Sequence, residues 1–263
     1  MTTPFSIYFI VKNEAERLPE SLQKVVGLTD DLVVVDSGST DGTQDIAQRF
    51  GARVVHHDWE GFARQKAFAA SLCRHDWVLD LDADEILSDE LVSRLRSLFE
   101  QGPPADVAGY SMRWVFVSPQ PGHPFVYSPD QRILRLYHRS RAAITPELHS
   151  NNDRPQVLQG RVVALPEQVW HKSAMTLTQL ESKYVKVSSD QAAYFHRSGR
   201  RIATWRLVLE LPVKFFKYYV LQGNYRNGWY GFCVAAIAAN RNFMRLAKAK
   251  EAELLDQLAS RDD

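Results

Sequence analysis

Residues 77–85, Trp-Val-Leu-Asp-Leu-Asp-Ala-Asp-Glu, constrain the fold of this 263-residue chain more than any other segment. An apolar run that ends in carboxylates is typical of a buried strand in a parallel sheet, and open α/β sheets bind ligands beyond the carboxyl ends of such strands. Carboxylates this close together repel one another unless a cation or hydrogen-bond donors compensate them. A divalent ion such as Mg²⁺, held by one or two carboxylates and by phosphate oxygens of a substrate, would do so. The alternative is that the acids only cap a following helix.

Strands and helices are expected to alternate through the first hundred residues. Apolar runs predict strands at 5–11, 31–36, 53–56 and 77–82, with helices at 14–26, 43–50 and 62–72. A fourth helix is expected after Ser88, because a hydroxyl followed by two acids is typical of a helix N-terminus. This order favours right-handed βαβ units, and therefore an α/β fold with a mostly parallel sheet flanked by helices.

The pattern changes after residue 101. Strands are predicted at 109–117, 132–138 and 157–165, followed by helices at 176–197, 204–222 and 229–258. Pro212 is expected to kink the second of these helices or to start it afresh. We therefore expect a domain over 1–175, divided into halves at 1–101 and 102–175, and a helical C-terminal region at 176–263.

The formal net charge of +1 conceals an asymmetry along the chain. Residues 1–100 contain 10 Lys and Arg against 18 Asp and Glu, whereas residues 197–250 contain 11 Lys and Arg and one acid, Glu210. The same basic segment carries ten of the chain's aromatic residues. An acidic first part suits metal chemistry, and a basic, aromatic second part suits an anionic surface such as a membrane. Some of these aromatics must instead pack inside the protein, and no recognition motif accompanies the basic residues, so we expect no nucleic-acid partner.

Two further observations bear on the compartment. The two cysteines, Cys73 and Cys233, lie far apart in apolar surroundings and are expected to be reduced thiols in a cytoplasmic protein. No secretory signal is evident at the N-terminus, and the longest uncharged apolar run, 229–239, is too short to cross a bilayer, which needs roughly 20 residues.

Polar residues follow three of the predicted strands. Asn13 and Glu14 come after the first strand, Asp36 after the second, and Asp82 ends the fourth. Because the carboxyl ends of parallel strands share one edge of a sheet, these side chains are expected to meet there. We expect Asp36 to contact a ligand, whereas Asp41 in the following Gly/Ser turn is expected to cap a helix.

These segments resemble family 2 glycosyltransferases. The residues that carry the resemblance are 11–14, 33–43, 59–66 and 81–85, joined by 130–132, 135–137, 170–171, 183–184 and 214–232. Within the family, the similarity is greatest to the subgroup that adds a sugar, commonly glucose, to the lipopolysaccharide inner core. The resemblance implies a GT-A fold, in which 1–175 is the catalytic domain, 1–101 its nucleotide-sugar-binding half and 102–175 its acceptor-side half. It also implies inverting transfer from a UDP-sugar with Mg²⁺ or Mn²⁺.

The resemblance assigns roles by position. Glu14 and Asp36 would hold the uridine with Asn13 beside them, Asp82 would lie near the ribose and the metal, and Asp84 would coordinate the metal. Gln65 and Lys66 resemble a Gln-Lys pair of the family, in which the lysine meets the diphosphate; a solvated helix lysine is the alternative.

The remaining assignments leave more than one role open. Arg132 and Arg135 are candidates to bind phosphate, with surface or packing roles equally open. His171 is a candidate metal ligand. Asp80 is expected to be structural, and Glu85 either orients the loop or caps the next helix.

An inverting transferase needs a general base that takes the proton of the acceptor hydroxyl. Asp130 and Glu147 are the two candidates. Relatives commonly show a His-Glu pair near this point, but here Ser150 follows His149, so Glu147 would have to act from the other side of the histidine. We favour Asp130 by a thin margin.

The resemblance further implies a lipid-linked saccharide as acceptor. The basic, aromatic C-terminal region predicts peripheral association with the cytoplasmic side of the inner membrane. One alternative is a polyprenyl-phosphate glycosyltransferase of the same fold, and another, which is not an enzyme, is a nucleotide-sugar-binding protein without turnover. A third is a phosphatase of the haloacid dehalogenase kind, because Asp80-Leu81-Asp82 is an Asp-x-Asp sequence after a strand. In that class the motif lies near the first strand and is followed by other residues than in this chain, so the sequence fits the phosphatase class poorly.

Overall fold

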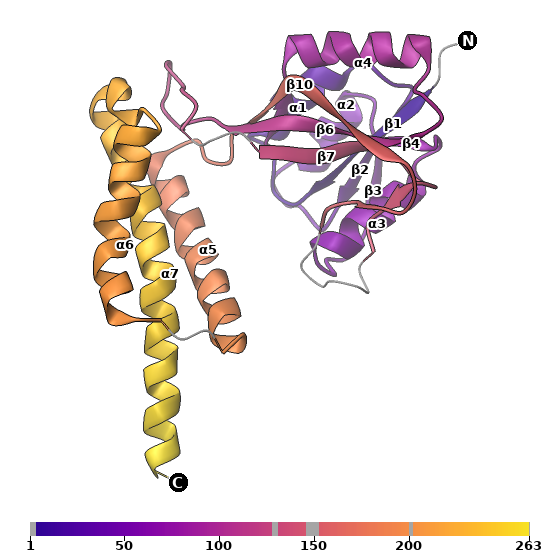
Figure 1. Ribbon diagram of the computed structural model, residues 1–263. Helices are drawn as coiled ribbons and strands as arrows, with labels where there is room; N and C mark the ends of the chain where they lie inside the picture. Colours follow the sequence, from indigo (N-terminus) through magenta and orange to yellow (C-terminus); the bar gives the residue numbers. More distant parts are fainter. Residues whose placement is uncertain (1–3, 128–130, 146–152, 200–201, 263) are drawn as a thin grey trace. The chain divides into compact units, whose positions relative to one another are not determined.

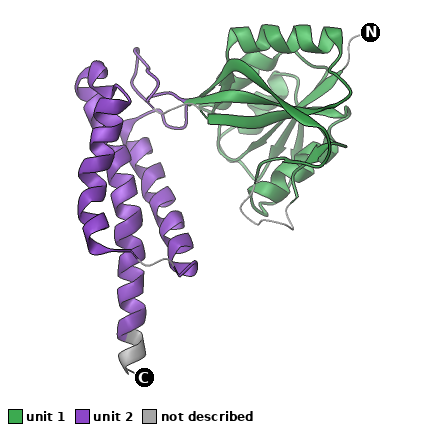
Figure 2. Cartoon of the chain, viewed as in Figure 1, with its two compact units in different colours: residues 1–115, 130–171 green, residues 116–129, 172–263 purple. Residues whose placement is uncertain are grey.

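The computed structural model describes residues 4–127, 131–145, 153–199 and 202–262. It divides into two compact units, one of residues 1–115 and 130–171 and one of residues 116–129 and 172–263 (Figure 2). The segment 116–129, which the sequence analysis assigns to the acceptor-side half, belongs to the second unit. Tyr127 in this segment is buried in a core that it shares with Leu180 and Tyr230.

A mixed sheet of eight strands forms the centre of the first unit (Figure 1). Its strands are β1 (Phe5–Val11), β2 (Asp31–Asp36), β3 (Arg53–His56), β4 (Trp77–Asp82), β5 (Glu85–Leu87), β6 (Val107–Phe116), β7 (Gln131–His138) and β10 (Arg161–His171). Their order across the sheet is β3-β2-β1-β4-β7-β6-β10-β5. The first four strands in this order are parallel, and β7 joins β4 in antiparallel direction. The predicted α/β class with a parallel sheet is confirmed.

Helices cover both faces of the parallel strands. They are α1 (Leu18–Val25), α2 (Thr43–Arg49), α3 (Phe62–Leu72) and α4 (Asp89–Gln101). Alternate residues of β1 point to opposite faces, as a strand requires. Phe9 packs in the core that contains α1, α2 and α4, whereas Tyr8 packs in the core that contains α3. The N-terminus of α4 is capped as predicted, since the Ser88 hydroxyl accepts a hydrogen bond from the Leu91 amide.

The strand register brings the predicted polar residues to one edge. Val11 pairs with Asp36 on one side of β1, and Ile10 pairs with Asp82 on the other. The loops after β1, β2 and β4 therefore leave the sheet at the same level, which is where parallel sheets bind their ligands.

Two predicted elements differ from the structure. The first helix begins at Leu18 rather than at 14, because the Glu14 carbonyl accepts hydrogen bonds from the Arg17 and Leu18 amides in a turn that precedes it. The strand predicted at 157–165 is instead the longer β10. Gln156–Val157 (β9) pairs separately with Ala142–Ala143 (β8), in a small second sheet that sequence periodicity gives no reason to expect.

The second unit is helical. Besides the segment 116–129, it contains α5 (Leu177–Arg197), α6 (Thr204–Phe216), a π-helical turn η1 (Lys217–Leu221), a 3₁₀ turn η2 (Asn224–Asn227) and α7 (Gly228–Asp262). Pro212 lies inside α6 and does not restart it; the α-helical geometry changes only at Lys217. None of the helices in the described ranges has the length and apolar character that crossing a membrane requires.

Candidate functional site

The loop after β2 is organised by Asp36. This buried carboxylate accepts hydrogen bonds from the amides of Gly38 and Ser39, both at 2.9 Å, from the Ser39 hydroxyl, and from Nε2 of Gln44 at 2.7 Å. Burial alone would raise the pKa of Asp36, but these donors outweigh it and hold the pKa below its usual value. Asp36 thus fixes the Gly/Ser turn in the ionised form, and Gly38 supplies the positive φ of +85° that the turn requires.

The loop after β1 is joined to the same turn. Asn13 has a φ of +56°, and its Oδ1 accepts a hydrogen bond from the Thr40 amide at 2.9 Å. The Glu14 amide donates to Thr43 Oγ1 at 2.8 Å, and the Asp41 carboxylate accepts from the amides of neighbouring residues of both loops. The structure therefore brings Asn13, Glu14 and Asp36 together, and it ties Asp41 to the start of α2.

The carboxylates at the end of β4 are matched by two buried cations. Asp80 is fully buried and lies 3.1 Å from Lys66 Nζ and 3.0 Å from Arg135 Nη1. Asp82 lies 2.9 Å from each of the same two cations, and its side chain is 31% exposed. Glu85 is fully buried and pairs with Arg135, and it accepts a hydrogen bond from Trp114 Nε1 at 2.7 Å. The protein itself thus supplies much of the positive charge that this run of acids needs.

The pKa values of these three acids are shifted in different directions. Burial raises the pKa of Asp80 although Lys66 and Arg135 oppose the shift. Burial also raises the pKa of Glu85, to about 8, against the opposing charge of Arg135. For Asp82 the two cations outweigh burial and hold the pKa well below its usual range. Asp82 is therefore the partly exposed member of the cluster and the one whose ionised form is most favoured.

Asp84 lies beyond this cluster and contacts a different set of residues. Its Oδ2 is 3.0 Å from Nε2 of the buried His171 and 4.0 Å from an Nη atom of Arg17. The ring of His171 stacks on Trp114, with 4.1 Å between centroids. Arg17 also pairs with Glu14 at 2.7 Å. Because Arg17 lies near both carboxylates, Glu14 and Asp84 face the same region. Burial raises the pKa of Glu14 against the opposing charge of Arg17, and the nearby charge of Asp84 adds to the rise.

These residues suit a divalent cation shared with a substrate. Within residues 4–127, 131–145, 153–199 and 202–262, no three His, Cys, Asp or Glu side chains are grouped closely enough to hold a metal by themselves. Mg²⁺ is usually held by one or two carboxylates together with phosphate oxygens, so Asp82 and Asp84 fit this mode of binding. The Nε2 of His171, a candidate metal ligand in the sequence analysis, contacts Asp84 at 3.0 Å and thereby orients that carboxylate.

Three further candidates make contacts within the protein. Gln65 is buried, and it contacts Ser37 Oγ at 2.9 Å and His57 Nδ1 at 2.9 Å. Lys66 is fully buried, and besides Asp80 and Asp82 its Nζ contacts a third carboxylate, that of Asp153, at 3.7 Å. Arg132 donates to the carbonyl of Leu165 at 2.8 Å. In the structure these side chains position the site, and their roles toward a ligand remain proposals. The two candidate bases, Asp130 and Glu147, lie outside the described residues, as does His149.

Sequence reasoning missed Arg17 and Trp114. Arg17 follows Glu14 by three residues, a spacing that allows an ion pair within one turn and could have drawn attention to it. Trp114 lies in β6, and nothing in the sequence indicates that this strand reaches Glu85 and His171, because the contact depends on the order of strands in the sheet.

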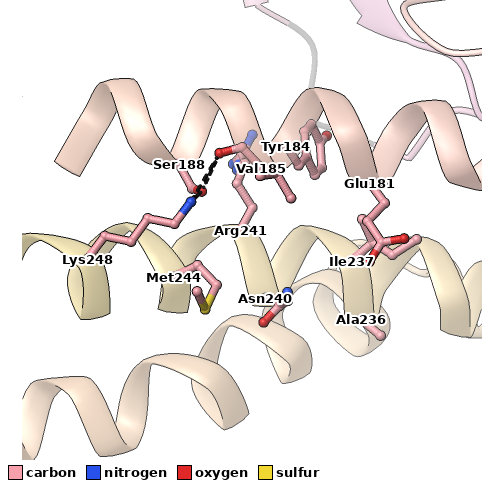
Figure 3. A pocket seen from close by; sticks show the side chains of 10 residues that line it. All are labelled: Glu181, Tyr184, Val185, Ser188, Ala236, Ile237, Asn240, Arg241, Met244 and Lys248. Atoms are coloured by element: carbon pink, nitrogen blue, oxygen red, sulfur yellow. Dashed lines mark hydrogen bonds between the residues drawn. The ribbon is translucent and has the colours of Figure 1, made fainter. Parts of the chain in front are cut away.

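A groove of about 430 Å³ lies in the helical unit between α5 and α7 (Figure 3). Arg241 lies over the ring of Tyr184 there, 4.6 Å from its centroid, and Lys248 donates to the Ser188 hydroxyl at 2.8 Å. None of the residues that line this groove is a site residue predicted from the sequence. The convergent acids and loops at the carboxyl edge of the sheet are the candidate site.

Comparison with known proteins identifies the family of the chain. The model of the family described as "Glycosyl transferase family 2" matches residues 6–150, more than half of the chain. An uncharacterized glycosyltransferase of Rickettsia conorii (strain ATCC VR-613 / Malish 7) is 32% identical over 260 residues, which cover 97% of this chain and 92% of the relative. The lipopolysaccharide core biosynthesis glycosyltransferase LpsC of Rhizobium meliloti (strain 1021) is 28% identical over 284 residues, covering 99% and 97%.

A solved structure also aligns with most of the chain. It is S. aureus TarS 1–349, with a TM-score of 0.48 and 15% identity over 97% of this chain and 92% of that one. The family match includes the ends of β1, β2 and β4, which contribute to the candidate site, but not His171 at the end of β10. From the family match and the Rickettsia relative, the chain belongs to glycosyl transferase family 2, and it is a glycosyltransferase.

Proposed function

We propose that the protein transfers a sugar, glucose in the first instance, from a UDP-sugar to a lipid-linked saccharide of the lipopolysaccharide inner core, with inversion at the anomeric carbon. The observation that carries this proposal is the meeting of Asp36, Asp82 and Asp84 at one edge of the parallel strands. The acceptor class is supported by the similarity over nearly the full chain to a lipopolysaccharide core glycosyltransferase. The basic, aromatic C-terminal region supports action at the cytoplasmic face of the inner membrane.

The donor would bind across the loops after β1 and β2. Asn13, Glu14 and the turn held by Asp36 would contact the uridine, and Asp82 would face the ribose. A divalent cation, Mg²⁺ or Mn²⁺, held by Asp82 and Asp84, would stabilise the negative charge that grows on the departing diphosphate. Lys66 and Arg135 would keep Asp82 ionised and fixed in position, and His171 would hold Asp84. Asp130 or Glu147 would take the proton of the acceptor hydroxyl as its oxygen attacks.

Ligand-induced stabilisation tests the donor and the metal together. We expect UDP-glucose with Mn²⁺ to raise the melting temperature of the protein, and GDP- or ADP-glucose to raise it less. A ligand at 100 times its dissociation constant stabilises the folded state by about 2.7 kcal/mol. Removal of the metal with EDTA should abolish most of the shift, and Asp84→Asn should weaken metal-dependent binding at least tenfold.

The matched control is Asp89→Asn, which removes an exposed carboxylate that pairs with Lys24 on the same unit. This variant should respond to UDP-glucose and Mn²⁺ as the wild type does. Equal stabilisation with and without metal would contradict the assignment of Asp84. Release of UDP on addition of core saccharide then separates a transferase from a nucleotide-sugar-binding protein, because the latter would bind the donor without releasing UDP.

A further inference from the structure

The exposed side of α6 is apolar. Residues 205, 208, 209, 213 and 216, which carry large exposed side chains, are related by steps of three or four, which places these side chains on one face of the helix. Exposed apolar side chains continue into η1, and the six most exposed of the two elements are between 49% and 71% exposed. This set, named here the α6 stripe, comprises Trp205, Val208, Leu209, Val213, Phe216 and Leu221.

The opposite side of α6 holds its acidic group. Glu210 is buried, with its Oε1 3.0 Å from Arg245 of α7 and 4.0 Å from Lys214. Leu207 packs on a small core that contains Leu246. The helix is thus attached to α7 by an ion pair and a few apolar contacts, while its more apolar face points away from them. A helix on a water-facing surface normally turns its apolar side toward the protein and its polar side toward water, so the orientation of α6 is the reverse.

An apolar surface of this extent marks an interaction site, because soluble proteins rarely expose large contiguous apolar patches. The charge around it indicates the partner. Arg206 and Lys217 lie on α6 and η1 beside the stripe, and Glu210, the one acid in the sequence between 197 and 250, is paired inward. Two copies of a segment with a formal net charge of +10 would repel each other, whereas an anionic surface would be attracted.

Aromatic residues at the ends of the exposed segment point to the same partner. Trp205 begins the stripe and is 68% exposed, and Trp229, at the start of α7, is 72% exposed. Tryptophan is enriched where a bilayer meets water, since its ring is apolar and its indole N–H needs a polar partner. Amphipathic helices with basic borders lie in this interfacial layer with their apolar face turned toward the lipid.

We propose that the α6 stripe is a membrane-docking surface that lies in the headgroup layer of an anionic bilayer, with Arg206 and Lys217 on the lipid phosphates. The inference rests on the proposed function in one respect, since a lipid-linked acceptor gives the enzyme a reason to bind there. The physical argument stands on the exposed residues of α6 alone.

Vesicle co-sedimentation of the full chain tests the proposal. We expect the wild type to bind vesicles that contain phosphatidylglycerol and to bind pure phosphatidylcholine vesicles at least tenfold less. The pair Trp205→Ser and Phe216→Ser should reduce binding to anionic vesicles at least tenfold, as should a second pair, Val213→Ser and Leu221→Ser. Lys217→Glu should reduce binding most at low salt, because exposed charges are screened as ionic strength rises.

The matched control is the pair Tyr194→Ser and Leu255→Ser, which removes exposed apolar side chains of α5 and α7 outside the stripe. This control should bind anionic vesicles as the wild type does, and circular dichroism should show that every variant keeps its helical content. The proposal is overturned if the wild type stays in the supernatant with all vesicles. It is also overturned if the stripe variants bind anionic vesicles as well as the wild type does. A third contradicting outcome is a wild-type dimer in sedimentation velocity that the stripe substitutions convert to a monomer.

Failure of the docking surface and failure of the proposed function give different results. Binding to vesicles is measured without donor or acceptor, so it does not depend on turnover. UDP release with a delipidated, water-soluble core saccharide does not depend on docking, and the stripe variants should release UDP from this acceptor at the wild-type rate.

Discussion

Lys66 and Arg135 show how the site keeps several carboxylates close together. Both cations are almost completely buried, and both contact Asp80 and Asp82. A lysine in a helix is usually read as a solvated side chain, and the family resemblance suggested contact with a diphosphate. In the structure Lys66 contacts the acids, and together with Arg135 it holds the pKa of Asp82 below its usual range. Its contact with a diphosphate stays a prediction.

Removing the charge of Lys66 should destabilise the protein strongly. Lys66→Met leaves Asp80 and Asp82 with Arg135 as their one remaining close cation among the described residues, and breaking a buried ion pair typically costs about 3–5 kcal/mol. Urea unfolding in the absence of metal measures the loss of unfolding free energy. The double variant Lys66→Met with Asp80→Asn should recover part of it, because the uncompensated buried charge is removed.

Lys24→Met is the control for this prediction. Lys24 pairs with Asp89 at 2.6 Å on the surface, and exposed pairs contribute between 0 and about 1 kcal/mol. A loss for Lys66→Met no larger than that of Lys24→Met would show that the buried network does not stabilise the fold.

At the scale of single elements, the start of α7 depends on a close approach that only glycine permits. A Cβ atom on Gly231 would lie 2.0 Å from the carbonyl oxygen of Asn224 in η2, and both residues are buried. The side chain of Asn224 in turn donates to the carbonyl of Tyr218 in η1 at 2.9 Å. The turns between α6 and α7 are therefore fixed against the first turn of α7 by backbone contact.

Gly231→Ala should destabilise the helical unit, although alanine is the better helix former. Forcing a methyl group into a packed site typically costs about 1–3 kcal/mol, and the obstructing atom here belongs to the backbone. Thermal unfolding followed by circular dichroism at 222 nm measures the effect. Asn240→Ala, an exposed site on the same helix, should be neutral or slightly stabilising; a stabilised Gly231→Ala would mean that η2 does not pack against α7 in this way.

On the scale of the whole molecule, the chain contains separate hydrophobic cores in its two units. The cores of the sheet unit collect side chains from its strands and helices, such as Leu79 and Leu95. Those of the helical unit collect side chains from α5, α6 and α7, such as Leu246. Because each unit buries its own apolar surface, each is expected to respond to core mutations largely on its own.

Two matched truncations test this independence. Leu95→Ala and Leu246→Ala each remove a fully buried leucine side chain, one from α4 and one from α7, and each should cost about 2–5 kcal/mol. Hydrogen exchange measured by mass spectrometry should show faster exchange in β1–β4 and α4 for the first variant, and in α5–α7 for the second. Equal acceleration in both units by either variant would show that the chain unfolds as one cooperative body.

The sequence by itself determined the α/β class, the parallel strands and the edge of the sheet at which the polar residues meet. These follow from local patterns, since an apolar run of strand length that ends in acids has few other structures open to it. The family, too, could be recognised from these segments. Helix and strand boundaries were less certain, as the late start of α1 at Leu18 and the extension of β10 to His171 show.

Only the tertiary structure decided which partners the polar residues have. Arg135, Trp114 and His171 come from β7, β6 and β10, and they reach the acids of β4 and β5 because of the order of strands in the sheet. The inverted polarity of α6 likewise appears only once Glu210 is seen paired with Arg245, since a helical pattern alone does not tell which face points inward. The physical reason is the same in both cases. Local sequence fixes the type of an element, whereas the charges and surfaces that an element meets are set by residues distant in the chain.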